Sequence, residues 1–470
     1  MKKTYSMYIL IYFILFSHKN VIAQEIQLND VLDSVDKHFP LLLAALKDKT
    51  LAETELKNAQ GSFDPVLKLK GNATPVGYYR QFRFDSALEQ ATPFWGTSAT
   101  LGYRLGFGDF ADYDGKLQTN SLGEIRAGLQ IPILKNGYTD RRRTNIERAE
   151  QGIVAADQQI KQQYIEYFRL AAQRYVEYVG AHHRFDVSEK LHKIAQERDE
   201  QLKKRVNKGD IARIDQIDNQ RLIIQRQGFM LSQKRLIENT GIELGLYFRD
   251  QNAEPYTLKQ QPILPQFPNQ PLPTESCRNE HLKQALLLRP DLLRLQTQIV
   301  QNQIELKFSK NQLLPNLDLN LGVSKDFGTG YSSKAKTEFD IGLSFEFPLL
   351  LRQAQSKIQA TQASIQKLEF QHRFIRDRIT ADIKDAYSAL SIAHARVVLA
   401  QEEFMLSQTV ENAERTKFQQ GDSTLIFVNL REQSSAETQI KYIDARVDYH
   451  RAFANYLAAI GQDHRTYKCE

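Results

Sequence analysis

The chain has 470 residues, of which 25% are charged and 41% are hydrophobic, a composition typical of soluble, helix-rich proteins. Its formal net charge of +6 includes the lysines of the first 23 residues, so the charge of the rest is too weak to indicate a nucleic-acid-binding protein. With only two cysteines, the chain is not a disulfide scaffold.

The first 23 residues have the pattern of a secretory signal peptide. Lys2 and Lys3 precede the apolar run 7–16, and small or β-branched residues end at Ala23, ahead of an expected cleavage site. A membrane anchor is the weaker alternative, because the run is about half the roughly 20 residues that a spanning helix needs. No other segment could span a membrane as a helix, so we expect an exported chain that is periplasmic, secreted or inserted as a β-barrel.

The rest of the chain repeats itself. Four pairs of landmarks recur in the same order: Pro40 and Pro290, Pro65 and Pro315, Pro132 and Pro348, Gly209 and Gly421. The first two pairs share one offset, which indicates an internal duplication. We therefore expect a signal peptide at 1–23, a first repeat at 24–254, a proline-rich connector at 255–275 and a second repeat at 276–470.

Each repeat contains extended segments in which apolar and polar residues alternate, within about 64–133 in the first copy and 314–348 in the second. In one of them, Leu317, Leu319, Leu321 and Val323 share a face. A half-buried sheet of a soluble domain alternates in the same way. The segment length of about ten residues and the export signal favour a membrane barrel with an apolar outside and a polar lumen. Segment 78–108, rich in glycine and aromatic residues, could add barrel strands or form an external hairpin.

Long helices follow the extended segments. Residues 139–206 contain no proline and residues 352–420 contain neither proline nor glycine, so each is expected to form one helix of roughly 100 Å. The second helix has a heptad seam of apolar residues, which indicates coiled-coil packing: Ile379, Ile383, Ala386, Leu390, Ala393, Val397, Ala400 and Phe404. Each helix stops at a Gly-Asp pair and a second helix returns, so the helical regions cover about 139–247 and 352–460.

This order of elements, present twice, resembles the TolC family of outer-membrane efflux proteins over essentially the whole mature chain. The resemblance implies a mainly α-helical homotrimer, anchored in outer-membrane lipid by a shared β-barrel that a periplasmic coiled-coil tunnel continues. Two strands per repeat would give four per chain and a 12-stranded barrel, since four strands cannot close alone.

The resemblance also implies a function. The chain would be the exit duct of a tripartite efflux pump or type I secretion system, in the cell outer membrane, working with a periplasmic adaptor protein and an inner-membrane pump. The residues leave two alternatives open, a periplasmic adaptor and a coiled-coil structural or surface protein, although an adaptor carries one helical hairpin where this sequence has two.

The helix turns would form the periplasmic tip and contact the adaptor. They are Lys208, Gly209 and Asp210 in the first copy and Gln420, Gly421 and Asp422 in the second. In the family, acids six and nine residues after the second turn narrow the channel mouth. This chain departs from that pattern, because Phe427 and Leu430 occupy those positions.

The corresponding positions of the first copy hold Asp215 and Asp218. One interpretation is that these acids are solvated helix residues and that Phe427 and Leu430 pack in a helix seam. The other is a gate that combines an apolar constriction with an acidic collar favouring cations, with Arg213 bracing the closed state by pairing with an acid.

The resemblance places Cys277 and Cys469 in one equatorial belt, which makes them a candidate disulfide in an oxidising compartment. Other sites are not expected. His182 and His183 lack the spacing of metal ligands, and no constellation of residues has the chemistry of an active site. We therefore expect no enzymatic activity, no cofactor, no metal and no nucleic-acid partner.

Overall fold

The computed structural model describes residues 26–110, 118–258, 264–465 and 467. The predicted signal peptide, residues 1–23, lies outside them. The chain divides into two compact units, each built from separate stretches of sequence. Unit 1 combines Met1–Ser34, Ala171–Gln270 and His394–His450, and unit 2 combines Val35–Leu170, Pro271–Ala393 and Arg451–Glu470.

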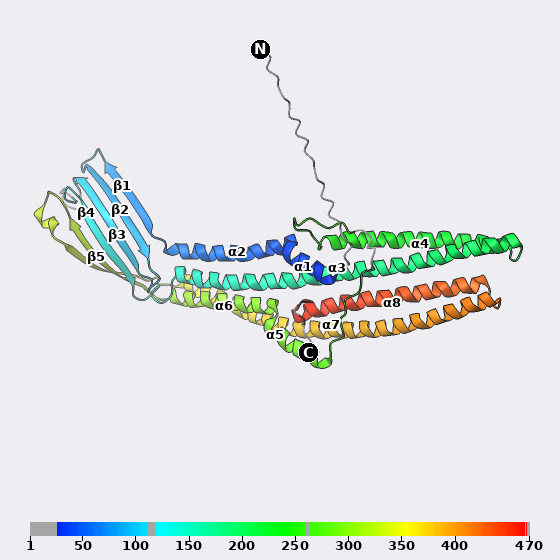
Figure 1. Cartoon of the computed structure of the whole chain (residues 1–470). Coiled ribbons are helices and arrows are strands. Elements are labelled where there is room, and N and C mark those ends of the chain that lie inside the picture. The colour runs from blue at the N-terminus through cyan, green and yellow to red at the C-terminus, as the bar shows by residue number, and fades with distance from the viewer. Residues whose placement is uncertain (1–25, 111–117, 259–263, 466, 468–470) are drawn as a thin grey trace, which may run out of the picture. The chain divides into compact units, whose positions relative to one another are not determined.

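In the described part of unit 2, six strands form one antiparallel sheet, and their order in the sheet follows their order in the chain (Figure 1). The strands are β1 (Val66–Thr74), β2 (Gln81–Ala91), β3 (Ser98–Gly108), β4 (Glu124–Pro132), β5 (Asn316–Asp326) and β6 (Glu338–Glu346). β4 and β5, which belong to the predicted first and second repeats, pair with each other in this sheet. β1 and β6 are its edges.

The prediction of four strands per chain is wrong, because β2 and β3 lie within segment 78–108 and add two strands to the sheet. The alternation that marks a strand is present in both: Phe82, Phe84 and Leu88 share a face in β2. Glycines at 102 and 106 in β3 lower the apparent strand propensity. The alternation of apolar and polar residues is therefore present in the sequence, but the glycines make the strand hard to recognise.

The strand register divides the sheet into an apolar and a polar face. One row of paired residues crosses all six strands with apolar side chains: Leu67, Leu88, Leu101, Ala127, Val323 and Phe339. A row on the opposite face carries charges of mostly alternating sign: Lys70, Asp85, Arg104, Glu124 and Asp326. Because side chains alternate along a strand, these rows represent the whole of each face.

Shorter helices connect to the sheet in unit 2. α2 (Pro40–Gln60) and α6 (Pro290–Asn311) each begin with a proline and each lead into a strand. Proline suits the first helical position because its fixed φ is helical and its missing amide would be unpaired there. The repeated prolines of the sequence therefore mark two helix starts. α5 (Glu275–Leu288) precedes α6, and its N-cap Thr274 accepts a hydrogen bond from the Cys277 amide.

Two long helices contribute residues to both units. α3 (Arg141–Lys208) has 68 residues and α7 (Arg352–Gln420) has 69, so each is roughly 100 Å long. Within the predicted apolar seam of α7, the side chains of Ile379, Ile383 and Leu390 are almost fully buried. None of the described helices is long and apolar enough to cross a membrane.

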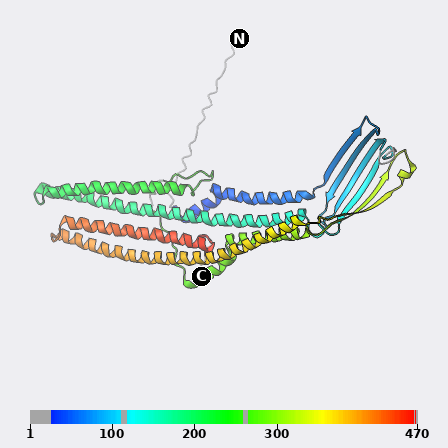
Figure 2. The same ribbon diagram turned by 180° about the vertical axis from the view of Figure 1, so that it is seen from behind.

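Unit 1 consists largely of two helical hairpins. α4 (Arg213–Gly245) runs beside α3, and α8 (Leu425–Ile460) runs beside α7, as both views show (Figures 1 and 2). α1 (Leu28–His38) begins in this unit. The end of the predicted connector lies against the helices, where Tyr449 donates a hydrogen bond to the Gln270 carbonyl at 2.7 Å. The Phe267 ring stacks on His183 and His450.

Candidate functional site

The two helix turns of unit 1, after α3 and after α7, are built in the same way. Gly209 and Gly421 follow the last residues of α3 and α7 with φ angles of +81° and +90°. The amides of Asp210 and Asp422 donate to the carbonyl five residues earlier, at 3.0 and 2.9 Å. This is the Schellman arrangement, which needs a left-handed residue and so favours glycine.

All six residues predicted to contact an adaptor are exposed: Lys208, Gly209, Asp210, Gln420, Gly421 and Asp422. A Cβ atom added to either glycine would meet nothing within 4 Å. The turns are therefore open surface in the single chain. The adaptor contact itself stays a prediction.

The gate candidates lie in the first turns after these loops. Asp215 and Asp218 are half-exposed on α4, and Asp218 Oδ1 accepts a hydrogen bond from Arg221 at 3.0 Å. Phe427 and Leu430 are 53% and 55% exposed on α8. Neither apolar side chain is therefore buried in a seam of its own chain.

Arg213, the predicted brace, is the first residue of α4 and is exposed. Among the residues that the structure describes, it has no ion-pair partner, since Asp218 pairs with Arg221 instead. Bracing by Arg213 against an acid of another copy stays a prediction.

A buried charge cluster further along the hairpins was missed in the sequence. The Glu432 side chain on α8 is 0% exposed and pairs with guanidinium groups from three other helices. Arg226 of α4 lies 3.0 Å from Glu432 Oε2 and Arg415 of α7 lies 3.3 Å from Oε1, while Arg198 of α3 pairs with the same Oε1. One carboxylate thus ties the two hairpins together.

A signal for this cluster exists in the sequence. Val428, Glu432, Ala436 and Ile443 are buried on one face of α8, at spacings typical of a helix seam. A carboxylate at a seam position must be paired, because an isolated buried charge is costly. The position of Glu432 in the seam can therefore be predicted from the sequence. Its three partners cannot, because they lie on helices whose packing against α8 the sequence does not specify.

The polar face of the sheet is hollowed by a cavity of about 620 Å³. Arg104 is central to it, with its Nε 2.8 Å from Asp85 Oδ1 and its Nη1 3.8 Å from Glu124 Oε2. Arg104 thus lies between two carboxylates, from β2 and β4, on this face of the sheet.

The candidate disulfide is only partly within the described residues. Cys277 is buried in α5, and its sulfur lies 3.5 Å from His281 Nε2. Cys469 lies outside the described part of the chain. The Cys277–Cys469 pairing stays a prediction. No group of three or more His, Cys, Asp or Glu side chains that could hold a metal occurs among the described residues.

Residues 281–462 match the family described as outer membrane efflux protein. No curated protein matches the sequence.

The fold matches solved outer membrane channels over nearly the whole chain. The outer membrane protein VceC of Vibrio cholerae matches with a TM-score of 0.64 and 15% identity, covering 94% of this chain and 97% of that one. The Campylobacter jejuni CmeC channel matches with 0.64 and 13%, covering 94% and 87%. The open-state MtrE channel of Neisseria gonorrhoeae matches with 0.64 and 14%, covering 93% and 89%.

The family match covers 182 of the 470 residues, fewer than half of the chain. At such low identity the structural likeness establishes the fold alone. Residues 281–462 thus match the outer membrane efflux protein family, and the chain as a whole has the fold of solved outer membrane proteins.

Proposed function

We propose that copies of this chain assemble into an outer membrane channel that serves as the exit duct of a tripartite efflux pump or type I secretion system. The observation that carries the proposal is the apolar face of the sheet, which nothing in the described chain covers. Leu67, Phe339 and Ile341 are 63%, 78% and 79% exposed. A soluble monomer rarely exposes so large an apolar surface, whereas lipid would cover it.

The strand lengths support insertion in a membrane. The six strands have 9 to 11 residues, which is the length of a tilted strand that crosses the hydrocarbon core. The charged face, opposite the apolar one, would then line a water-filled lumen.

The sheet edges support assembly of several copies. β1 and β6 are unpaired edges, and open edges are not tolerated in lipid. Because six is an even number, β6 of one copy can pair antiparallel with β1 of the next around a rotation axis. Three copies, the number that the family resemblance implies, would close a barrel of 18 strands in place of the 12 expected from four strands per chain.

The helical hairpins would extend from the barrel as a periplasmic tunnel. Their exposed Gly-Asp turns would meet the periplasmic adaptor, which links the channel to an inner-membrane pump. The gate would lie just above the turns, where three copies of Phe427 and Leu430 form an apolar constriction and three copies of Asp215 and Asp218 form an acidic collar. Acids gathered in a narrow mouth attract cations and repel anions.

Conductance of the purified protein in a planar lipid bilayer tests both the channel and its gate. We expect cation-selective current steps. The double variant Asp215→Asn/Asp218→Asn should weaken cation selectivity, and Phe427→Ala should raise conductance, because the constriction loses a ring. The control is Asp377→Asn, an exposed acid of α7 far from the turns, which should leave selectivity unchanged.

Each outcome has a definite meaning. Absence of current steps from the reconstituted wild-type protein and from Phe427→Ala alike would contradict the channel. Wild-type steps that none of the gate variants alters would show that the constriction lies elsewhere in the channel.

A further inference from the structure

A basic cavity lies in unit 2 where both strand-to-helix connections meet α6. Its volume is about 570 Å³. Four cationic side chains line it: Lys135, which follows β4, Arg141 and Arg352, the first residues of α3 and α7, and Lys357 of α7. The one acidic residue in its lining is Glu305 of α6. The lining thus has an excess of three positive charges.

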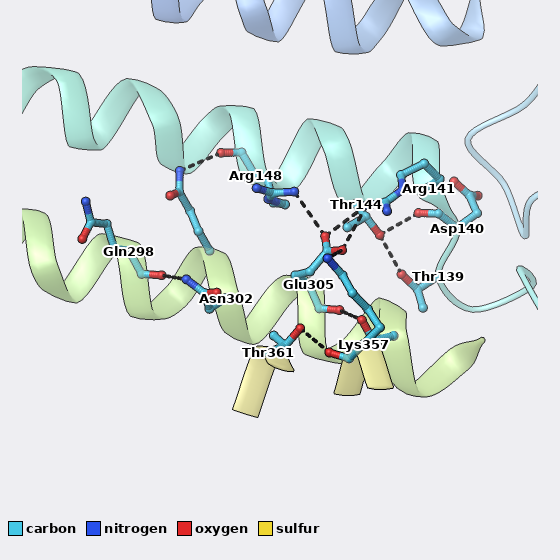
Figure 3. A network of polar contacts seen from close by, with 12 residues as sticks. Thr139, Asp140, Arg141, Thr144, Arg148, Gln298, Asn302, Glu305, Lys357 and Thr361 are labelled. Atoms are coloured by element: carbon cyan, nitrogen blue, oxygen red, sulfur yellow. Dashed lines mark hydrogen bonds and ion pairs between the residues drawn. The ribbon is translucent and has the colours of Figure 1, made fainter. Parts of the chain in front are cut away.

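The Glu305 carboxylate is already shared by three cations, so it does not neutralise the remaining positive charges of the lining (Figure 3). Its carboxylate, on a side chain only 9% exposed, lies 3.0 Å from Arg141 Nη1, 3.2 Å from Arg148 Nη1 and 3.6 Å from Lys357 Nζ. Lys135 and Arg352 have no ion-pair partner within the described ranges of the chain. Two cations of the cavity are therefore available to an anion from outside the chain.

The start of α7 adds to the positive potential. Arg352 is its first residue, and no acidic residue lies in its first turn. The positive end of a helix dipole repels cations and attracts anions. The start of α3 contributes less, because Asp140 Oδ1 already accepts a hydrogen bond from the Arg143 amide at 2.9 Å. A basic residue at the start of α7 is unfavourable on its own and becomes favourable when an anion lies beside it.

The cavity also has an apolar side. The Arg141 guanidinium lies 4.3 Å from the Phe308 ring centroid, and Leu350 and Leu351 form part of the lining. Leu349 is 88% exposed beside them, three residues after the end of β6. An anionic head that continues into an apolar tail fits this combination, and a free inorganic anion would leave the apolar side without a partner.

We propose that this cavity binds the phosphate of an anionic phospholipid headgroup at the periplasmic boundary of the outer membrane. The acyl chains would leave the cavity past Leu349 and lie against the apolar face of the sheet. Guanidinium and ammonium groups are strong phosphate ligands, and basic pockets beside membrane segments hold such headgroups. The inference rests on the proposed function, because it requires the sheet to lie in the membrane.

Native mass spectrometry of the full-length protein, purified from outer membranes and delipidated, tests the site. The probes are phosphatidylglycerol, zwitterionic phosphatidylcholine and inorganic phosphate. The test variant is Lys135→Gln/Arg352→Gln, which removes the two cations without ion pairs. The control is Arg142→Gln/Arg373→Gln, which removes two exposed cations of α3 and α7 that lie outside the cavity.

We expect saturable binding of phosphatidylglycerol in preference to phosphatidylcholine, weakened roughly 30-fold by the test variant and unchanged by the control. Equal binding of the two lipids, equal losses in both variants, or full displacement of the lipid by inorganic phosphate alone would overturn the proposal. Absence of lipid binding to the wild-type protein would also overturn the proposal. That result is expected if a neighbouring subunit fills the cavity.

Failure of the site and failure of the channel are distinguishable. A protein that sediments with the outer membrane and conducts ions but shows no preference for the anionic lipid contradicts this inference alone. A protein absent from the outer membrane contradicts the proposed function before any lipid is added.

Discussion

At the scale of single residues, the packing of unit 1 depends on a carboxylate that water does not reach. Glu432 is shared by Arg198, Arg226 and Arg415, and Arg415 also pairs with Glu411 at 2.7 Å. Such a cluster contributes less to stability than its number of ion pairs suggests, because all its members lose hydration. Removing the shared partner is nevertheless costly, since it leaves buried guanidinium groups without a counter-charge.

Glu432→Gln should therefore lower the free energy of unfolding of the helices by about 3 kcal/mol. Glutamine keeps the shape of the side chain, so the change isolates the charge. The measurement is urea unfolding followed by the helical circular-dichroism signal. The control is Glu437→Gln, an exposed acid of the same helix, for which a change within about 0.5 kcal/mol is expected. A Glu432→Gln effect no larger than that of the control would contradict the role given to the cluster.

His182 gives the stability of unit 1 a pH dependence. Its ring is buried in α3, with Nδ1 3.0 Å from the Tyr178 carbonyl oxygen, and burial lowers the pKa of His182 below its ordinary value, partly offset by that hydrogen bond. Between the lowered pKa and about 6.5, the unfolded chain binds more protons than the folded one. Stability is therefore fully present above about pH 6.5 and is lost as the pH falls below it.

We expect the urea midpoint to fall between pH 8 and pH 5, and His182→Gln to reduce the size of that fall. Glutamine retains a donor for the Tyr178 carbonyl but cannot gain a proton. His372→Gln, which changes a half-exposed histidine of α7, should leave the pH dependence as it is. If the urea midpoints of His182→Gln and His372→Gln depend on pH in the same way, His182 is not the source of the pH dependence.

At the scale of elements, the two helix turns differ from ordinary helix positions only in backbone conformation. A Cβ at Gly421 meets no atom within 4 Å, and the same holds for Gly228 in the interior of α4. The difference is that φ is +90° at Gly421, while Gly228 is helical. Substitution by alanine at the two positions therefore separates conformational strain from steric contact.

Gly421→Ala should lower the free energy of unfolding by about 1 kcal/mol, because a left-handed alanine is strained. Gly228→Ala should raise it by roughly 0.5–1 kcal/mol, because alanine favours a helix. Urea unfolding measures both. Effects of the same sign at the two positions would show that something other than φ determines the response of the turn.

The sequence indicates where helices, turns and strands form better than it indicates which of them contact one another. Prolines, glycines and heptad spacing located the long helices and their turns, because those signals are local in the chain. The sequence does not distinguish β2 and β3 from an external hairpin, because the glycines of β3 weaken a period-two pattern that the strand register makes evident. The cluster around Glu432 joins residues more than 200 positions apart, and no local pattern encodes such a contact. The gate candidates could be named only through the family resemblance, and they stay a prediction.

At the scale of the whole molecule, the apolar face and the two free edges of the sheet need to be covered. Within the described chain, Phe339 and Ile341 remain exposed and β1 and β6 have one neighbour each. Lipid on the face and neighbouring copies at the edges would satisfy both requirements at once.

Static light scattering of the protein extracted from isolated outer membranes in mild detergent, with the detergent contribution subtracted, measures how many copies assemble. We expect the protein in the outer membrane fraction and a particle with the mass of three chains. A protein recovered from the soluble periplasmic fraction as a particle of one chain would contradict the proposed assembly.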